Sequence, residues 1–393
     1  MKAENELLKG VVLGGQALKG KAEAKTPKLS TATIEFEKAK YAGMTKRTKQ
    51  KYVTAFKVLN EFLGNERLSD INHFKMNKFF MELKRLPPKR GGKFKDMTFK
   101  QMIAANDGEG IHKQSFDGYK SPIKLFIEWC NQTYESSFDG VNVAEIKYTG
   151  ARVGTEDGQR SFKADELEEL FKCKEMKEYC KSGKYVYKFW LPAIGLFSGM
   201  RVNEICQLNP FTDIVKEGDA WYFKIDAKTE AANDIVKSVK SGTARDVPIH
   251  SRLVELGLLD YIEALKKAGY KRMFPLDKPK GKVASGNTAR NFRRYIEDIG
   301  LRDETKNKKV LGMHAFRKTI ITQAYKGGFL KDLLCIVGHE SGSRDETGGM
   351  IPDVTKLYID DEAFDVPLVK KKETIEKVKF DIEFYKPVNP VFK

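Results

Sequence analysis

The segment GLFSGMRVNEICQL, residues 195–208, sets an arginine between two apolar stretches. The first stretch reads as an apolar helix that ends at Gly199, and Arg201 then opens a short helix with inward-facing apolar residues. An arginine in such surroundings must be paired or must bind an anion. Glu204 lies three residues further on, on the same helical face, where it can hold the guanidinium. Taken alone, the segment favours a structural Arg–Glu pair.

A histidine and an arginine with helical spacing form a second candidate group. His314 and Arg317, in MHAFRKTI, are three residues apart near an expected helix start. This spacing puts an imidazole beside a guanidinium, where helix N–H groups also favour an anion. A histidine satisfied in the core is the ordinary alternative, and the adjacent Arg317 and Lys318 weaken it.

Three further candidates stand near glycines. Lys240, in VKSVKSGTARDVPIH, is expected at a hairpin tip, with a solvated surface lysine as the alternative. His339, in CIVGHES, follows an apolar helix and a glycine, with a helix-capping histidine as the alternative. Tyr358 ends the polar, turn-rich stretch DETGGMIPDVTKLYID, with a half-buried packing residue as the alternative.

Composition favours a polyanionic partner. The chain has 393 residues, enough for two or three domains, and its formal charge of +17 indicates nucleic acid. No apolar run reaches the ~20 residues of a membrane-spanning helix, and the early VVLGG is too short for a signal-peptide core. We therefore expect a cytoplasmic protein without a membrane partner. The five cysteines form no close Cys/His pattern and are expected to be buried thiols.

Periodicity and turn signals divide the chain into five parts. In the second domain, AWYFKID, DIVKSV and ARDVPIH are expected strands between helices, so the fold class is mainly α with a small antiparallel β-sheet. The parts are a flexible or arm-like segment (1–40), a helical domain (41–147), a linker (148–160), a second domain (161–360) and a C-terminal tail (361–393).

The segment KRLPPKRGGKFKDMTFK is a candidate phosphate-binding loop. It carries seven basic side chains and one acid, and Pro-Pro and Gly-Gly pairs interrupt it. An ordinary solvated surface is the alternative. The residues expected to contact DNA are Lys84, Arg85, Lys89, Arg90, Lys93 and Lys95.

The order of these candidates along the chain resembles the tyrosine recombinases, the phage-integrase family. The resemblance covers residues 160–360, and the helical segment 41–147 looks like the core-binding domain of that family. VPIH after the lysine and MFP at Met273–Pro275 also agree. The ordered set is Arg201, Glu204, Lys240, His314, Arg317, His339 and Tyr358.

The resemblance implies a transesterification in which a tyrosine attacks a DNA phosphodiester. The products are a 3′-phosphotyrosine and a free 5′-hydroxyl, and the step needs neither a metal nor another cofactor. Guanidinium pairs suit the charge on the non-bridging oxygens. The implied roles are Tyr358 as nucleophile, Arg201, Arg317 and His339 as phosphate ligands, Lys240 as proton donor, His314 as proton acceptor and Glu204 as orienting residue.

The same resemblance implies partners and a role in DNA integration or mobility. Expected partners are double-stranded DNA, three further copies in a tetramer on two DNA sites, and accessory DNA-bending or directionality proteins. Members of the family often pass a C-terminal segment to a neighbouring protomer, so the tail at 361–393 is expected to pack in trans.

One spacing departs from the family pattern. Tyr358 follows His339 by 19 residues, which is longer than usual, and we interpret the polar stretch between them as an inserted loop. Tyr385 is the only later tyrosine, 46 residues past His339, and it is the weaker candidate.

Two rival functions remain open from the sequence. A type IB topoisomerase-like activity shares the chemistry but rejoins the same strand, and the basic N-terminal region favours recombination over it. A non-catalytic DNA-binding protein with the same fold is the other rival. It is disfavoured because buried cations without a phosphate to bind would cost stability.

Overall fold

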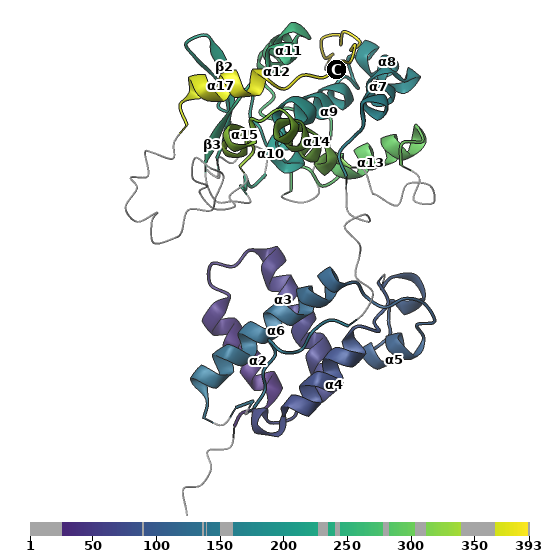
Figure 1. Ribbon diagram of the computed structural model, residues 1–393, viewed down its shortest axis with the longest axis vertical. Helices are drawn as coiled ribbons and strands as arrows, with labels where there is room; N and C mark the ends of the chain where they lie inside the picture. The colour runs from purple at the N-terminus through teal and green to yellow at the C-terminus, as the bar shows by residue number, and fades with distance from the viewer. Residues whose placement is uncertain are drawn as a thin grey trace, which may run out of the picture. The chain divides into compact units, whose positions relative to one another are not determined.

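The chain divides into two compact units. The computed structural model assigns Met1–Gly154 to the first unit and Thr155–Lys393 to the second (Figure 1). In the described part of the chain, no helix is long and apolar enough to cross a lipid bilayer. The structure describes residues 26–88, 90–135, 137–138, 140–149, 160–226, 235–239, 244–277, 283–302, 312–338 and 366–391.

The first unit is helical around an aromatic core. The ring of Phe36 packs against those of Tyr52, Phe56, Phe126 and Trp129, with centroids 5.4 to 5.8 Å away. Aromatic pairs stabilise beyond the area they bury, so this cluster joins three helices firmly. The helices are α2 (Leu29–Lys40), α3 (Lys46–Leu63), α4 (His73–Leu83), α5 (Phe99–Ala104) and α6 (Lys113–Thr133), with 3-10 turns at Leu68–Asp70 and Gly92–Phe94.

The arm expected at residues 1–40 is wrong for its last part, which forms α2. Residues 1–25 lie outside the described part of the chain. Leu29, Ala32 and Phe36 follow helical spacing and are buried in the core of the first unit. Helix α2 thus packs on the core through apolar residues with the same helical spacing that predicted α3 and α6.

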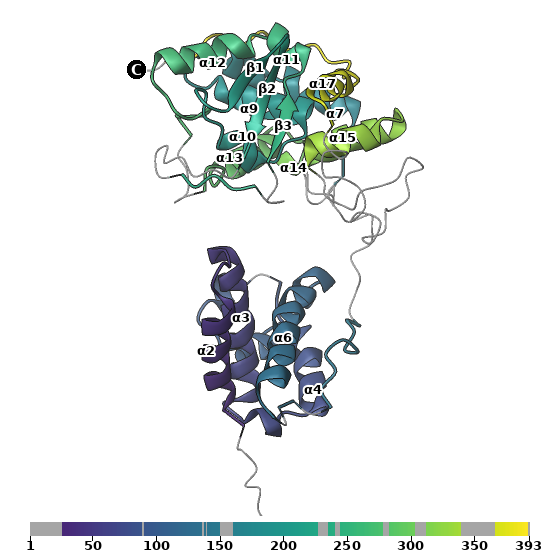
Figure 2. The same cartoon turned by 90° about the vertical axis from the view of Figure 1, so that its left-hand side faces the viewer.

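The second unit is mainly α with one small antiparallel sheet, as expected. Its strands are β1 (Ile214–Glu217), β2 (Ala220–Ile225) and β3 (Arg245–Pro248), in the order β1-β2-β3 (Figure 2). The helices are α7 (Ala164–Lys172), α8 (Lys174–Lys181), α9 (Tyr187–Ser198), α10 (Val202–Cys206), α11 (Ser251–Glu255), α12 (Leu258–Lys267), α13 (Thr288–Asp298), α14 (Met313–Lys326), α15 (Leu330–Val337) and α17 (Leu368–Glu376).

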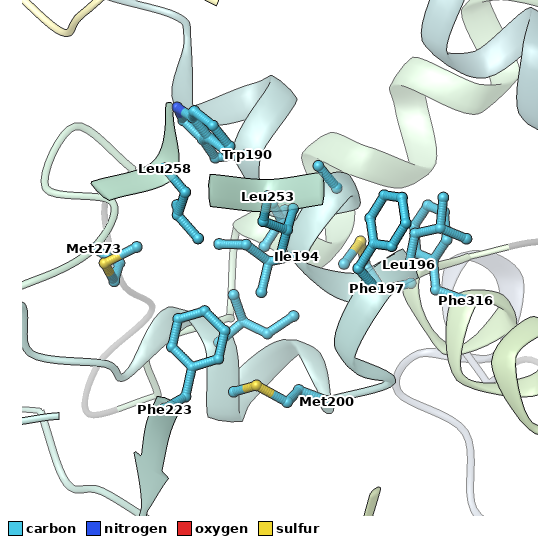
Figure 3. Close-up of a cluster of buried hydrophobic side chains, with 14 of the residues drawn as sticks. Trp190, Ile194, Leu196, Phe197, Met200, Phe223, Leu253, Leu258, Met273 and Phe316 are labelled. Carbon is cyan, nitrogen blue, oxygen red and sulfur yellow. The ribbon is translucent and has the colours of Figure 1, made fainter. Parts of the chain in front are cut away.

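Helix α9 runs through the core of the second unit. All its residues from 189 to 198 are buried, as expected of a helix that is apolar on every side (Figure 3). A Cβ at Gly195 would lie 3.3 Å from the ring of Phe316, so the missing side chain lets α14 approach closely. This approach sets the helix that carries Arg317 beside the turn that carries Arg201.

One of the three expected strands is wrong. Within DIVKSV, the described residues 235–239 do not join the sheet, and its first strand is β1 at Ile214–Glu217. Ile235, Lys237 and Val239 are buried and alternate with exposed residues, which imitates the period of a strand. Side-chain contacts to the loop before β1 and to α10 hold this stretch in place of a backbone ladder.

The C-terminal tail packs on its own second unit. Helix α17 lies against α15 and β3, and Ile375, Val378 and Ile382 are part of the apolar core (Figure 1). The chain then continues past α8, where Val388 and Val391 donate backbone hydrogen bonds to Cys180 and Gly183. Packing of this tail on a neighbouring protomer stays a prediction, and it would have to replace these contacts.

We predict that Gly199→Ala lowers the free energy of unfolding by about 2–4 kcal/mol. Gly199 has φ +62°, and a Cβ there would lie 2.8 Å from side-chain carbons of Ile320 and Val337. Gly218, in the β1–β2 turn, has φ +55° with nothing within 4 Å of its added Cβ. Gly218→Ala therefore tests the backbone strain alone and should cost about 1–2 kcal/mol. Urea unfolding of the full chain measures both, and equal losses would contradict the packing explanation.

Candidate active site

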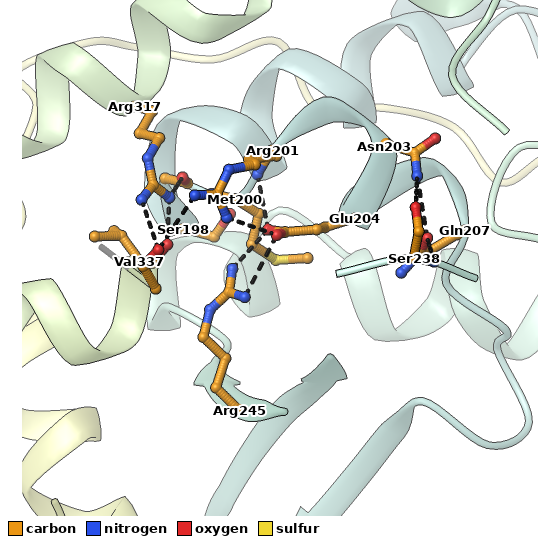
Figure 4. Close-up of polar contacts among 12 residues, drawn as sticks. Ser198, Met200, Arg201, Asn203, Glu204, Gln207, Ser238, Arg245, Arg317 and Val337 are labelled. Carbon is orange, nitrogen blue, oxygen red and sulfur yellow. Dashed lines mark hydrogen bonds and ion pairs between the residues drawn. The ribbon is translucent and has the colours of Figure 1, made fainter. Parts of the chain in front are cut away.

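Arg201 and Glu204 form the pair that the sequence predicted. Arg201 stands directly before α10, and its backbone N–H and Nη1 donate to the two carboxylate oxygens of Glu204 at 3.0 and 2.9 Å (Figure 4). The Glu204 side chain is 2% exposed, whereas that of Arg201 is 24% exposed. The carboxylate is therefore a fixed internal anchor, and the guanidinium retains a face toward solvent.

Arg317, on α14, is the second arginine of the site. Its Nη1 donates to the carbonyl oxygens of Gly199, at 3.1 Å, and of Val337. Its Nη2 donates to the carbonyl oxygen of Gly338 at 3.3 Å. Burial, followed by the charge of Arg201, lowers the pKa of Arg317 to about 10. The guanidinium remains charged at neutral pH because this pKa is still well above 7.

The two arginines meet at one carbonyl oxygen. Gly338 accepts from Nη2 of Arg201 at 3.2 Å and from Nη2 of Arg317 at 3.3 Å. This carbonyl lies at the C-terminal end of α15, where unpaired carbonyls and the helix dipole favour positive charge. Two guanidinium groups from distant parts of the sequence are thus brought into one cluster.

A third arginine, Arg245, belongs to the cluster, and the sequence reasoning missed it. It opens β3, and its Nη2 donates to Glu204 at 2.6 Å while Nε donates to the carbonyl oxygen of Ile336 at 2.9 Å (Figure 4). Strand alternation could have found it, since Arg245 shares a strand face with the buried Val247 and Ile249.

His314 lies where the helical spacing predicted. It occupies the first turn of α14, three residues before Arg317, with an exposed side chain. A buried core histidine is therefore the wrong interpretation of this position. An exposed imidazole one turn from a buried guanidinium can reach a group that approaches from solvent.

Known proteins resemble this chain in structure but not detectably in sequence. No protein-family model matches the sequence, and no curated protein is significantly similar to it. The structure is similar to that of a lambda integrase tetramer bound to a Holliday junction, with a TM-score of 0.54 and 16% identity over 88% of this chain and 90% of that one. It is also similar to the Tn1549 transposon integrase in complex with transposon right-end DNA, with a TM-score of 0.55 and 15% identity over 80% of this chain and 92% of that one.

The chain has the tyrosine-recombinase fold. A lambda integrase dimer bound to a COC′ core site agrees, with a TM-score of 0.53 and 16% identity over 92% of this chain and 87% of that one. The similarity covers most of the chain, which confirms the expected fold class of a helical unit followed by a mainly α unit with a small antiparallel sheet.

Three expected site residues of the tyrosine-recombinase fold lie outside the described residues. These are Lys240, His339 and Tyr358. Described neighbours precede two of them directly: the buried Val239 comes before Lys240, and Gly338, whose carbonyl joins the two arginines, comes before His339.

A buried ion pair lies three residues before Lys240. Nζ of Lys237 is 2.7 Å from a carboxylate oxygen of Asp213, and both side chains are almost completely buried. The next residue, Ser238, donates its backbone N–H to Oε1 of Gln207 at 3.0 Å and accepts from Asn203 through its hydroxyl at 3.3 Å. The chain before Lys240 is thus attached to the end of α10 and to the loop before β1.

The expected DNA-contacting residues of the first unit mostly have partners within that unit. Lys84 donates to Thr149, Arg85 pairs with Glu82, Lys93 pairs with Asp107, and Arg90 lies over the ring of Tyr119. Lys95 is exposed, Lys89 lies outside the described residues, and Phe94 between them is buried. DNA contact by these side chains stays a prediction.

The described part of the chain contains no candidate metal site. No group of three or more His, Cys, Asp or Glu side chains there could hold a metal ion.

We predict that Lys237→Met lowers the free energy of unfolding by about 3–5 kcal/mol, because it leaves the Asp213 carboxylate buried without a cation. The double variant Lys237→Met/Asp213→Asn should recover part of this loss, since the uncompensated charge is then gone. Lys267→Met removes an exposed pair with Glu263 and should change stability little. Urea unfolding measures all three. A double variant as unstable as the sum of its single variants would contradict the charge explanation.

Proposed function

We propose that this chain is a site-specific DNA recombinase that cuts and rejoins strands through a phosphotyrosine at Tyr358. One observation carries the proposal: the guanidinium groups of Arg201 and Arg317 converge on the carbonyl oxygen of Gly338, the residue before His339. Arginine pairs match the non-bridging oxygens of a phosphodiester in geometry and charge. The tyrosine-recombinase fold supports the same reaction class.

The described geometry suits a phosphate that gains charge during reaction. Arg201 is partly exposed and held by Glu204, so it can bind a non-bridging oxygen without first being oriented. Arg317 is buried, bonds the same Gly338 carbonyl and adds a second positive charge. His339 donates a further hydrogen bond to the phosphate. Since Arg201 and Arg317 are held by internal acceptors before DNA binds, these two groups need little reorganisation in the transition state.

Two proton transfers accompany strand cleavage. The phenol oxygen of Tyr358 attacks phosphorus, and its proton passes to His314, because a phenol with a reference pKa of ~10 is mostly protonated at neutral pH. The bond between phosphorus and the 5′-oxygen breaks, and Lys240 gives the leaving oxygen a proton. The reverse step, with a 5′-hydroxyl from a partner strand, rejoins DNA without ATP.

Partners follow from the fold. Lambda integrase has been solved as a dimer on a core site and as a tetramer on a Holliday junction. For this chain we propose double-stranded DNA as substrate, a homotetramer on two sites, and accessory DNA-bending or directionality proteins. The biological role would be integration of a phage or another mobile element, in the cytoplasm of its host.

We predict that a nicked suicide duplex traps a covalent protein–DNA adduct with the wild type and none with Tyr358→Phe. The duplex carries the repeat that flanks the element encoding the chain, and denaturing gels detect the adduct. Tyr385→Phe is the matched control, because the Tyr385 hydroxyl donates to the carbonyl of Lys172 and its ring packs against the core. This variant should keep wild-type adduct formation.

Other outcomes decide among the rival functions. An adduct that persists in Tyr358→Phe and disappears in Tyr385→Phe would contradict the assigned nucleophile. Specific DNA binding without any adduct would indicate a non-catalytic DNA-binding protein. Relaxation of supercoiled DNA without exchange between two sites would indicate a topoisomerase-like activity.

We predict that Lys240→Ala slows cleavage of ordinary DNA by about 10²–10⁴-fold. A duplex with sulfur in place of the leaving 5′-oxygen should restore the rate, because a thiolate leaves without a proton donor. Lys237→Met is the contrast: its lysine is paired with Asp213, so any loss it causes should be the same with both duplexes. Equal losses for Lys240→Ala on the two duplexes would exclude Lys240 as the proton donor.

A further inference from the structure

Arg245 connects Glu204, which holds Arg201, to the C-terminal end of α15. Its Nη1 and Nη2 donate to the two carboxylate oxygens of Glu204 at 3.4 and 2.6 Å, so it shares this carboxylate with Arg201. Its Nε donates to the carbonyl oxygen of Ile336 at 2.9 Å. One side chain from β3 thus joins the turn of Arg201 to the end of α15.

Arg245 already bonds acceptors within the unit, so we do not expect it to contact DNA directly. Its side chain is 7% exposed, and all three of its nitrogens donate to acceptors within the unit. Arg201 differs, because its side chain is 24% exposed. Any effect of Arg245 on a phosphate must therefore pass through the groups that it holds.

Gly338 shows how closely Arg245 approaches the end of α15. Gly338 has φ +64° and ends the helix in the left-handed conformation. A Cβ there would lie 2.9 Å from Cζ and Nε of Arg245, so the guanidinium lies against the bare Cα. The carbonyl of this glycine is the acceptor shared by Arg201 and Arg317, and His339 is the next residue.

Arg245 also affects how strongly Glu204 neutralises the charge of Arg201. Glu204 is the carboxylate that bonds both Arg201 and Arg245, and the charge of Arg317 also acts on it. Burial raises the pKa of Glu204, but hydrogen bonds and charge from Arg245 and then Arg201 outweigh it, so this pKa is lowered and the group stays ionised. Without Arg245, Glu204 would neutralise Arg201 alone and weaken its attraction for a phosphate.

We propose that Arg245 is a positioning residue for strand transfer: it holds Glu204 for Arg201 and the end of α15 for Gly338 and His339, without touching DNA. This inference rests on the proposed function and adds a residue to it. Lysine keeps the charge but lacks the fork that bonds Glu204 and Ile336 together, so it can replace Arg245 only in part.

The test is single-turnover cleavage of the same suicide duplex at saturating protein, with DNA affinity measured separately. We expect Arg245→Met to bind DNA within about threefold of the wild type and to cleave about 100-fold more slowly, the loss typical of small misplacements. Arg245→Lys should lie between the two. Arg160→Met, which removes another two-bond arginine–glutamate pair from the second unit, is the matched control and should cleave at the wild-type rate.

Two further readouts separate positioning from a general loss of stability. The cleavage losses of Arg245→Met and Glu204→Gln should not add in the double variant, because both act through one carboxylate. The rate of Arg245→Met should also fall as pH decreases, since Glu204 then loses its strongest bonding partner and its pKa rises. The ratio of this rate to the wild-type rate should fall over the same range, because the wild type keeps Glu204 ionised, whereas protonation of the proposed base His314 slows both proteins alike.

Each remaining outcome counts against a specific statement. Wild-type cleavage by folded Arg245→Met, or additive losses with Glu204→Gln, overturns the positioning role. A large loss of DNA affinity with a smaller salt dependence overturns it too, because it would indicate a phosphate contact. If Arg245→Met does not fold, Arg245→Lys decides by the same criteria. If the wild type forms no adduct, the proposed function itself fails.

Discussion

Three guanidinium groups in one partly buried cluster repel one another unless each finds acceptors, and this constraint shapes the second unit. The acceptors are the Glu204 carboxylate, the Gly199 carbonyl and the carbonyls at the end of α15, at Ile336, Val337 and Gly338. The acceptors and the three arginines come from the turn between α9 and α10, from the end of α15, from α14 and from β3. The cluster therefore exists only when α9, α10, α14, α15 and β3 are packed together, and it depends on the fold as much as on its own residues.

Local spacing made part of this site predictable. The pairs Arg201–Glu204 and His314–Arg317 are three residues apart on single helices, so helical geometry alone places their members together. Periodicity and turn signals predicted the fold class, and the order of the candidates along the chain indicated the tyrosine-recombinase fold. Arg245 could not be assigned in the same way, because its partners are a carboxylate and a carbonyl from distant segments. Strand alternation indicates that it faces inward, but it does not indicate which group it meets there.

The two wrong predictions, a strand at residues 235–239 and an arm where α2 lies, have a common physical cause. Residues 235–239 alternate between buried and exposed, as a strand does, yet contacts of Lys237 and Ser238 satisfy them instead of a ladder. Helix α2 meets the core through Leu29, Ala32 and Phe36 among many polar residues, so its apolar period is weak in the sequence. In both places the spacing of buried residues suited more than one structure. The segments that they pack against decide between these structures, and those segments lie elsewhere in the chain.

The tail has a consequence for how the protein is made. Ile375, Val378 and Ile382 complete an apolar core that begins with Phe162 and Leu167. A ribosome releases the chain from its N-terminus, and domains fold as units when their residues have emerged. The first unit can therefore close while the second still lacks part of its core. The nascent chain passes through a stage in which a finished N-terminal unit is tethered to an open one, whose apolar surface must be shielded until the last helix arrives.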